Sequence, residues 1–115
     1  MTLRAVGKTY SLDDRAALLD DAAAIIEQRG YDPTLSAPRG VTIIGAVSAA
    51  ASAYGDPSSA FRDAMFLVNT RFLIETGTPS RTSDVAWVTW TRSLDQESAA
   101  TFLHSTAAIV REQAS

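Results

Sequence analysis

The chain has 115 residues, of which 46% are hydrophobic and 20% are charged, and its formal net charge is −3. This is the size of one domain, which we expect to span residues 1–115, and the scattered arginines of an acidic chain argue against a nucleic-acid partner. The absence of cysteine excludes disulfides, thiolate zinc sites, iron–sulfur clusters and cysteine nucleophiles.

No stretch of the sequence approaches the run of about 20 apolar residues that crosses a bilayer. The most apolar region, 41–54, is interrupted by glycine and by hydroxyl residues, which is typical of a buried helix. Arg4 and Lys8 lie near the N-terminus, but no apolar segment follows them, which argues against a signal peptide. We therefore expect a cytoplasmic protein without a membrane partner.

The first predicted helix spans 12–29. Ser11 begins a capping box, and Asp13 and Asp14 lie where the helix dipole is positive. Gly30 follows as a residue that can end the helix. The apolar positions that recur at helical spacing are Leu12, Ala16, Leu19, Ala22, Ala23 and Ile26.

The same helix carries five carboxylates, at Asp13, Asp14, Asp20, Asp21 and Glu27. Their spacing places them on a face opposite the apolar stripe. We interpret this face as the solvated side of an amphipathic helix, because the chain has no motif that would bring further metal ligands to it. We predict no metal site.

A connection with Pro33 and Pro38 follows, and the second helix begins near residue 42 or 43 and extends toward Tyr54. Its small residues recur every fourth position, at Gly45, Ala49 and Ala53. Such a strip lets another backbone approach closely. We therefore expect a central helix that is contacted on more than one side.

The third predicted helix spans 57–75, with Asp56 as its N-cap and Pro57 at its first position. Its main apolar stripe contains Phe61, Ala64, Met65, Val68 and Phe72. Four further apolar residues, Phe66, Leu67, Leu73 and Ile74, widen the apolar surface beyond what one neighbouring helix would cover. This breadth predicts burial on two sides or a contact within an oligomer.

Residues 85–91 contain both tryptophans of the chain among β-favouring residues. Their alternation predicts a short extended segment, whereas a helical alternative would place Trp87 and Trp90 on one face. At least one tryptophan should fill the core between the flanking helices, and Trp87 is the better candidate. Trp90, beside Arg92, is the residue that we would mutate first to find a function.

The last predicted helix begins after Asp95, has Glu97 in its first turn and frays at 113–115. His104, the only histidine, falls on the face away from the apolar stripe of this helix, so we expect an exposed surface histidine. No nucleophile elbow, phosphate-binding glycine loop or dinucleotide fingerprint occurs in the chain. We predict no catalytic residue and no cofactor.

Three short motifs resemble an uncharacterised family of small actinobacterial and actinophage proteins, a domain of unknown function. Residues 27–31 match the Glu-x-Arg-Gly-aromatic end of the family's early helix, and 42–46 stand where the family has a Cys-Ala-x-Gly-Ala helix start. Trp87 and Glu97 match the spacing of its Trp-Asn-Asp turn and a later Glu, although Val88 and Thr89 replace Asn-Asp. The resemblance implies no established activity.

These observations predict a mainly α fold, a small bundle of about four helices with one short extended segment before the last helix. We expect a non-catalytic module that associates with itself, as a homodimer, or with a protein partner. The alternative is a small-molecule-binding protein or minor enzyme with an aromatic pocket, in which His104, Asp84 or Arg81 supplies polarity. The candidate binding residues are Trp87, Trp90, Arg81, Arg92, Tyr54, Phe72 and His104.

Overall fold

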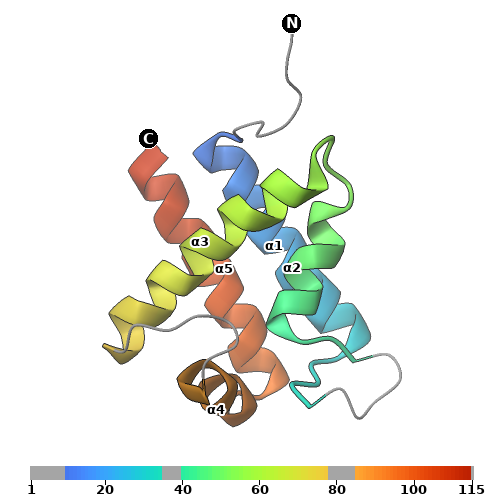
Figure 1. The fold of residues 1–115 in the computed structure, drawn as a ribbon, viewed down its shortest axis with the longest axis vertical. Helices are drawn as coiled ribbons and strands as arrows, with labels where there is room; N and C mark the ends of the chain where they lie inside the picture. Colours follow the sequence, from blue (N-terminus) through green and yellow to red (C-terminus); the bar gives the residue numbers. More distant parts are fainter. Residues whose placement is uncertain (1–9, 35–39, 78–84, 115) are drawn as a thin grey trace, which may run out of the picture.

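The computed structural model describes residues 10–34, 40–77 and 85–114. Within these ranges the chain forms five helices and an isolated bridge between Tyr31 and Val41, so the mainly α prediction is confirmed (Figure 1). In chain order the helices are α1 (Leu12–Arg29), α2 (Ile43–Ala51), α3 (Pro57–Thr76), α4 (Val85–Ser93) and α5 (Gln96–Ala114).

Helices α1 and α5 form the most extensive helix pair of the bundle and run antiparallel to each other (Figure 1). At one end of the pair, the Gln96 side chain at the start of α5 accepts a hydrogen bond of 3.3 Å from the Tyr31 backbone N–H, just beyond α1. Helix α2 packs against α1, and α3 crosses in front of both α1 and α5. The core therefore lies between α1, α5 and the helices that cover them.

Local capping chemistry sets the bounds of α1 as predicted. The Ser11 hydroxyl accepts a hydrogen bond of 3.0 Å from the Asp14 backbone N–H. At the other end, Gly30 has a φ of 90°, which side-chain-bearing residues rarely adopt, and its N–H bonds to the Ile26 carbonyl. The buried residues of the helix are Ala16, Leu18, Leu19, Ala22, Ala23 and Ile26.

The second helix differs from the prediction at its end and in the role of Gly45. Helix α2 stops at Ala51 instead of extending toward Tyr54. A Cβ at Gly45 would lie 3.2 Å from the Oγ1 of Thr42, the residue that caps α2, and among the described residues no other helix backbone comes within 4 Å of it. The expectation that Gly45 admits a second backbone was therefore wrong, since the glycine makes room for the cap.

Helix α3 follows the predicted signals, with Asp56 as its cap and Pro57 in its first turn. The Asp56 carboxylate accepts a hydrogen bond of 3.3 Å from the Ser59 N–H. The helix ends at Thr76, before Gly77 in the left-handed conformation with a φ of 69°.

The prediction of an extended segment at 85–91 was wrong, because these residues belong to α4. In a helix, residues three apart share a face, and this geometry lets Trp87 and Trp90 both pack against Phe72 of α3. The gain from burying Trp87 and from packing the partly buried Trp90 there outweighs the β preference of the neighbouring residues. Trp87 is 3% exposed and belongs to the core, as expected.

Two valines offer a matched test of this core. Val68 of α3 is fully buried, whereas Val85 at the start of α4 is 80% exposed. Val68→Ala removes two methyl groups from the core, so we expect it to lower the free energy of unfolding by about 2 kcal/mol. Val85→Ala should change it by less than about 0.5 kcal/mol. Urea denaturation followed by circular dichroism measures both, and equal losses would contradict the burial of Val68.

Candidate functional site

Three of the candidate residues come together in one aromatic cluster, which consists of Phe72, Trp87, Trp90 and Phe102. The Trp90 ring centroid lies 5.0 Å from that of Phe72 and 4.8 Å from that of Phe102. Trp87 lies 5.3 Å from Phe72 and 5.6 Å from Trp90. These edge and tilted contacts are the favourable geometry for aromatic pairs, so the cluster joins α3, α4 and α5.

The other candidates lie elsewhere. Tyr54 packs edge-on against Tyr10 and donates a hydrogen bond of 3.0 Å to the Asp14 carbonyl, next to the start of α1. Arg92 is exposed in the last turn of α4. His104 faces α1 from α5, and Arg81 and Asp84 lie outside the described residues. Tyr54 and His104 therefore take no part in the aromatic cluster.

A surface groove of about 500 Å³ opens beside the aromatic cluster, and we call it the Trp90 groove. Trp90 and Leu94 line it from α4 and the residue that follows, and Phe102 lines it from α5. Its polar lining comes from both α3 and α5. These residues are Arg71, Glu75, Thr76, Glu97, Ser98, Thr101 and Ser105.

Arg71 is the organising polar residue of the seam between α3 and α5. Its Nε lies 2.7 Å from the Glu75 carboxylate, and its Nη1 donates to the hydroxyls of Ser105 at 3.0 Å and Thr106 at 3.2 Å. Its guanidinium also lies 5.4 Å from the centre of the Phe102 ring. Because Arg71 and Glu75 satisfy each other, their charges largely cancel in the groove.

On the other side of Arg71 the same seam is apolar. A second groove of about 320 Å³ is lined by Leu67 and Ile74 of α3 and by Ile109 and Val110 of α5. Beside it, α3 and α5 turn large apolar side chains toward solvent. We call these residues the apolar face, and their exposed fractions are 67% for Phe66, 41% for Leu73, 72% for Ile74 and 40% for Ile109.

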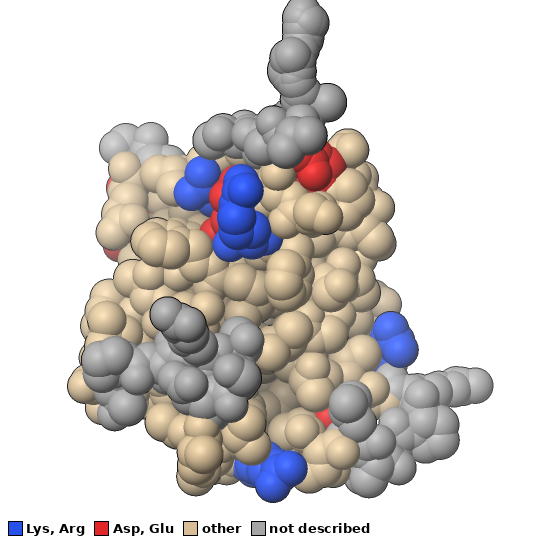
Figure 2. Space-filling view, in the orientation of Figure 1, with Lys and Arg blue, Asp and Glu red and all other residues tan. Residues whose placement is uncertain are grey.

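The apolar face is found on the side of the molecule that α3 crosses. In the orientation of Figure 1, α3 lies at the front, and Figure 2 shows that the middle of this side is free of acidic and basic side chains where the described residues form it. A group of acidic and basic side chains lies above this middle, in the upper part of the view, and other charged groups lie near the edges. An exposed helix face normally carries polar residues, so this arrangement is unusual for a helix with no further neighbour.

A third arrangement, which the sequence did not reveal, links α1 to α5. The Nδ1 of His104 lies 2.7 Å from the Asp20 carboxylate, and its Nε2 lies 3.6 Å from Glu27. Arg111 donates a hydrogen bond of 2.5 Å to the other oxygen of Asp20. The expectation of a solvated carboxylate face was therefore wrong for Asp20, which is partly buried against α5, whereas Glu27 contacts His104 but remains exposed.

The contacts in this ion cluster of Asp20, Glu27, His104 and Arg111 shift two pKa values. The hydrogen bond to Asp20 raises the pKa of His104 above its usual value of 6.5, although partial burial acts against it. Burial alone would raise the pKa of Asp20, but hydrogen bonds from His104 and Arg111 outweigh it and lower that pKa below 3.8. Both imidazole nitrogens face carboxylates of α1, so the cluster links α1 to α5.

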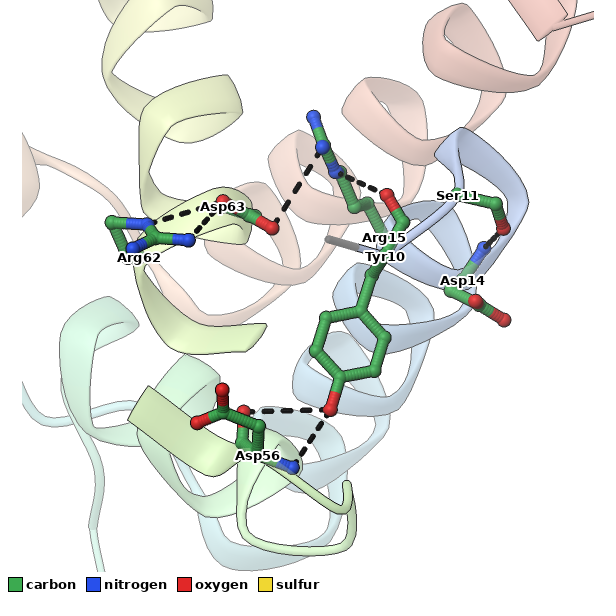
Figure 3. A network of polar contacts seen from close by, with 7 residues as sticks. All are labelled: Tyr10, Ser11, Asp14, Arg15, Asp56, Arg62 and Asp63. Carbon is green, nitrogen blue, oxygen red and sulfur yellow. Dashed lines mark hydrogen bonds and ion pairs between the residues drawn. The ribbon is translucent and has the colours of Figure 1, made fainter. Parts of the chain in front are cut away.

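A polar network near the start of α1 holds α3 in place (Figure 3). The Tyr10 hydroxyl accepts a hydrogen bond of 2.8 Å from the Asp56 backbone N–H. Arg15 donates to the Tyr10 carbonyl at 3.0 Å and lies 3.7 Å from Asp63, which Arg62 also contacts at 3.3 Å. These contacts connect the two helix starts and bring together no nucleophile and base.

Within the described ranges, no group of three or more His, Asp or Glu residues is placed to hold a metal ion. In the same part of the chain, no helix combines the length and the apolar character that crossing a membrane requires. Comparison of the chain with models of protein families, with curated proteins and with solved structures gave no match. The resemblance found in the sequence motifs therefore stays a prediction.

The single histidine allows a direct test of the ion cluster, because its imidazole protons give one NMR titration curve. In the wild type we expect the His104 midpoint above 6.5, and Asp20→Asn should move it down toward that value. Asp21→Asn, which changes the neighbouring exposed carboxylate, is the control and should leave it unchanged. The same midpoint in wild type and Asp20→Asn would refute the link.

The sign of the stability effect follows from the two shifts. Since the pKa of His104 is raised, its contribution is fully present below the unfolded value of 6.5 and is lost as the pH rises through the folded pKa. Since the pKa of Asp20 is lowered, its contribution is present above 3.8 and is lost as the pH falls through its folded pKa. The difference in unfolding free energy between wild type and Asp20→Asn should therefore be largest between pH 3.8 and pH 6.5, where both contributions are present.

Proposed function

We propose that this protein is a non-catalytic binding module that forms a homodimer through the apolar face of α3 and α5. The observation that supports this proposal is the exposure of Phe66 and Ile74, at 67% and 72%, on a helix whose opposite side is already buried in the core. Leaving two such side chains in water is unfavourable, and burying them in an interface recovers about 25 cal/mol for each Å² removed from water.

A second copy of the chain fits this face better than a charged partner does. Phe66 and Ile74 each lie four residues from Thr70, in opposite directions along α3. A two-fold axis near Thr70 would therefore set Phe66 of one copy against the partner's Ile74, which is the self-complementarity that an isologous interface requires. The face also lacks an unpaired charge at its middle that would repel its own copy, because Arg71 is neutralised by Glu75.

The size of the face sets the expected affinity. On α3 the apolar face extends from Phe66 to Ile74, which is about 12 Å along a helix, and the adjoining part of α5 widens the face to about 20 Å. The product is on the order of 250 Å² for each copy, which is well below the roughly 800 Å² of a standard-size interface. We therefore expect a reversible dimer with a dissociation constant in the micromolar range.

The cellular setting stays a prediction from the sequence. We place the dimer in the cytoplasm, and we propose that it does not bind nucleic acid, since the chain is acidic with a net charge of −3. A small-molecule site is the second candidate function, and the Trp90 groove is the feature that favours it.

Charge substitutions in the apolar face test the dimer. We expect Phe66→Asp and Ile74→Asp each to raise the dimer dissociation constant by more than about tenfold, because each places two carboxylates in a symmetric apolar interface. Sedimentation velocity and light scattering across a micromolar concentration series measure this constant. Circular dichroism should show unchanged helix content, since both side chains are exposed in the monomer.

The matched control is Val85→Asp, which introduces the same charge at an apolar residue that is 80% exposed and lies outside the face. This variant should dimerise like the wild type. The proposal would be overturned if the wild-type chain remained monomeric at several hundred micromolar. This concentration is about 20-fold or more above the expected dimer dissociation constant. Equal dimerisation of Ile74→Asp and wild type would also overturn the proposal.

A further inference from the structure

We propose that the Trp90 groove binds a small organic cation, an ammonium or guanidinium group carried on an apolar stem. This site is separate from the apolar face, since neither Phe66 nor Ile74 lines it. Its volume of about 500 Å³ falls within the roughly 300–1,000 Å³ of small-molecule sites.

The apolar part of the ligand is matched by one wall of the groove. Trp90, Leu94 and Phe102 line this wall, and Trp90 is held in place by its contacts with Phe72 and Phe102 at 5.0 and 4.8 Å. A fixed aromatic wall binds an apolar stem without a large loss of side-chain entropy. It also attracts a cation, because the indole has the most favourable ring face for a cation among the aromatic side chains.

The charge of the ligand follows from the charges around the groove. Arg71 and Glu75 pair at 2.7 Å, which leaves Glu97 as the carboxylate in the lining that makes no ion pair within the described residues. Arg71 contacts Ser105 of α5, which lies eight residues after Glu97. This separation is about 12 Å along a helix. A cation beside Glu97 is therefore attracted by its carboxylate, and it lies toward the opposite end of the lining on α5 from Ser105, which contacts Arg71.

Hydroxyl groups of the groove can accept hydrogen bonds from the cationic group of the ligand. Ser98 and Thr101 follow Glu97 on α5 and also line the groove. Hydroxyl oxygens accept hydrogen bonds, so they can take N–H donors from an ammonium or guanidinium group. The Arg71 guanidinium over the Phe102 ring, at 5.4 Å, already shows this pairing of cation and aromatic ring in the wall of the groove.

The test follows the two indole N–H resonances of the full-length ¹⁵N-labelled chain, assigned with Trp87→Phe and Trp90→Phe. The probe is benzylammonium, and benzyl alcohol and benzoate are its neutral and anionic counterparts of similar shape. We expect benzylammonium to shift the Trp90 resonance in a saturable way and to bind at least about fivefold more tightly than either counterpart. Equal binding of all three would overturn the proposal.

Variants of the lining identify the groove as the site. Glu97→Gln should weaken benzylammonium binding about fivefold. Trp90→Phe, followed by backbone amide resonances because it has no Trp90 indole, should weaken binding about threefold to tenfold while preserving an aromatic ring in the cluster. The control is Asp13→Asn, which makes the same change of charge at an exposed carboxylate of α1 that does not line the groove. Unchanged binding to Glu97→Gln, or no saturable shift of Trp90, would refute the assignment.

A last binding experiment distinguishes two kinds of ligand, a free small cation and a cationic side chain of a protein partner. A short peptide whose only charged group is the guanidinium of a central arginine offers the same chemistry on a larger molecule. Weaker binding of the peptide than of benzylammonium supports the free cation, and tighter binding overturns it in favour of a protein partner. Ile74→Asp should bind benzylammonium as the wild type does, so a failure of the proposed dimer leaves this result intact.

Discussion

The antiparallel contact between α1 and α5 forms the centre of the bundle, against which α2 and α3 pack. Both helices bury small residues, among them Ala16 and Ala23 of α1 and Ala99 and Ala107 of α5. Small side chains let helix axes approach closely, so the centre of the bundle is narrow. The large rings then fill the space at the edges of this pair, where α3 and α4 cover it. The aromatic cluster is thus a consequence of a core whose central helices carry mostly aliphatic and small residues.

Local signals were sufficient for the helices whose ends are capped by their own side chains. Ser11 and Asp56 predicted the starts of α1 and α3, because a cap acts on a backbone N–H three residues away. The same reasoning failed for α4, since its helical state depends on rings of α3 and α5 that are distant in sequence. His104 and Asp20 are 84 residues apart, so no periodicity in a single sequence could pair them. Their contact required the three-dimensional arrangement of α1 and α5.

Helix α4 is fixed to the bundle by polar contacts as well as by its tryptophans. The Tyr31 hydroxyl, just beyond α1, donates a hydrogen bond to the Thr91 carbonyl of α4. Burial of this hydroxyl raises the pKa of Tyr31 to about 12, and the bond to Thr91 reduces the shift in part. The phenol therefore stays protonated and available as a donor. Together with Trp87 it explains why a helix of only nine residues holds its position beside the Trp90 groove.

Arg71 connects the two surfaces to which we assign binding. Its side chain separates the Trp90 groove from the apolar groove, and it lies in both linings together with Glu75. A guanidinium can occupy an apolar seam only if its donors are satisfied, and Glu75, Ser105 and Thr106 provide the acceptors. The two sites nevertheless depend on different forces. Dimerisation through Phe66 and Ile74 gains from apolar area, whereas a cation beside Glu97 gains from an exposed charge that salt screens. One helix pair can therefore carry two binding surfaces that respond to different solution conditions.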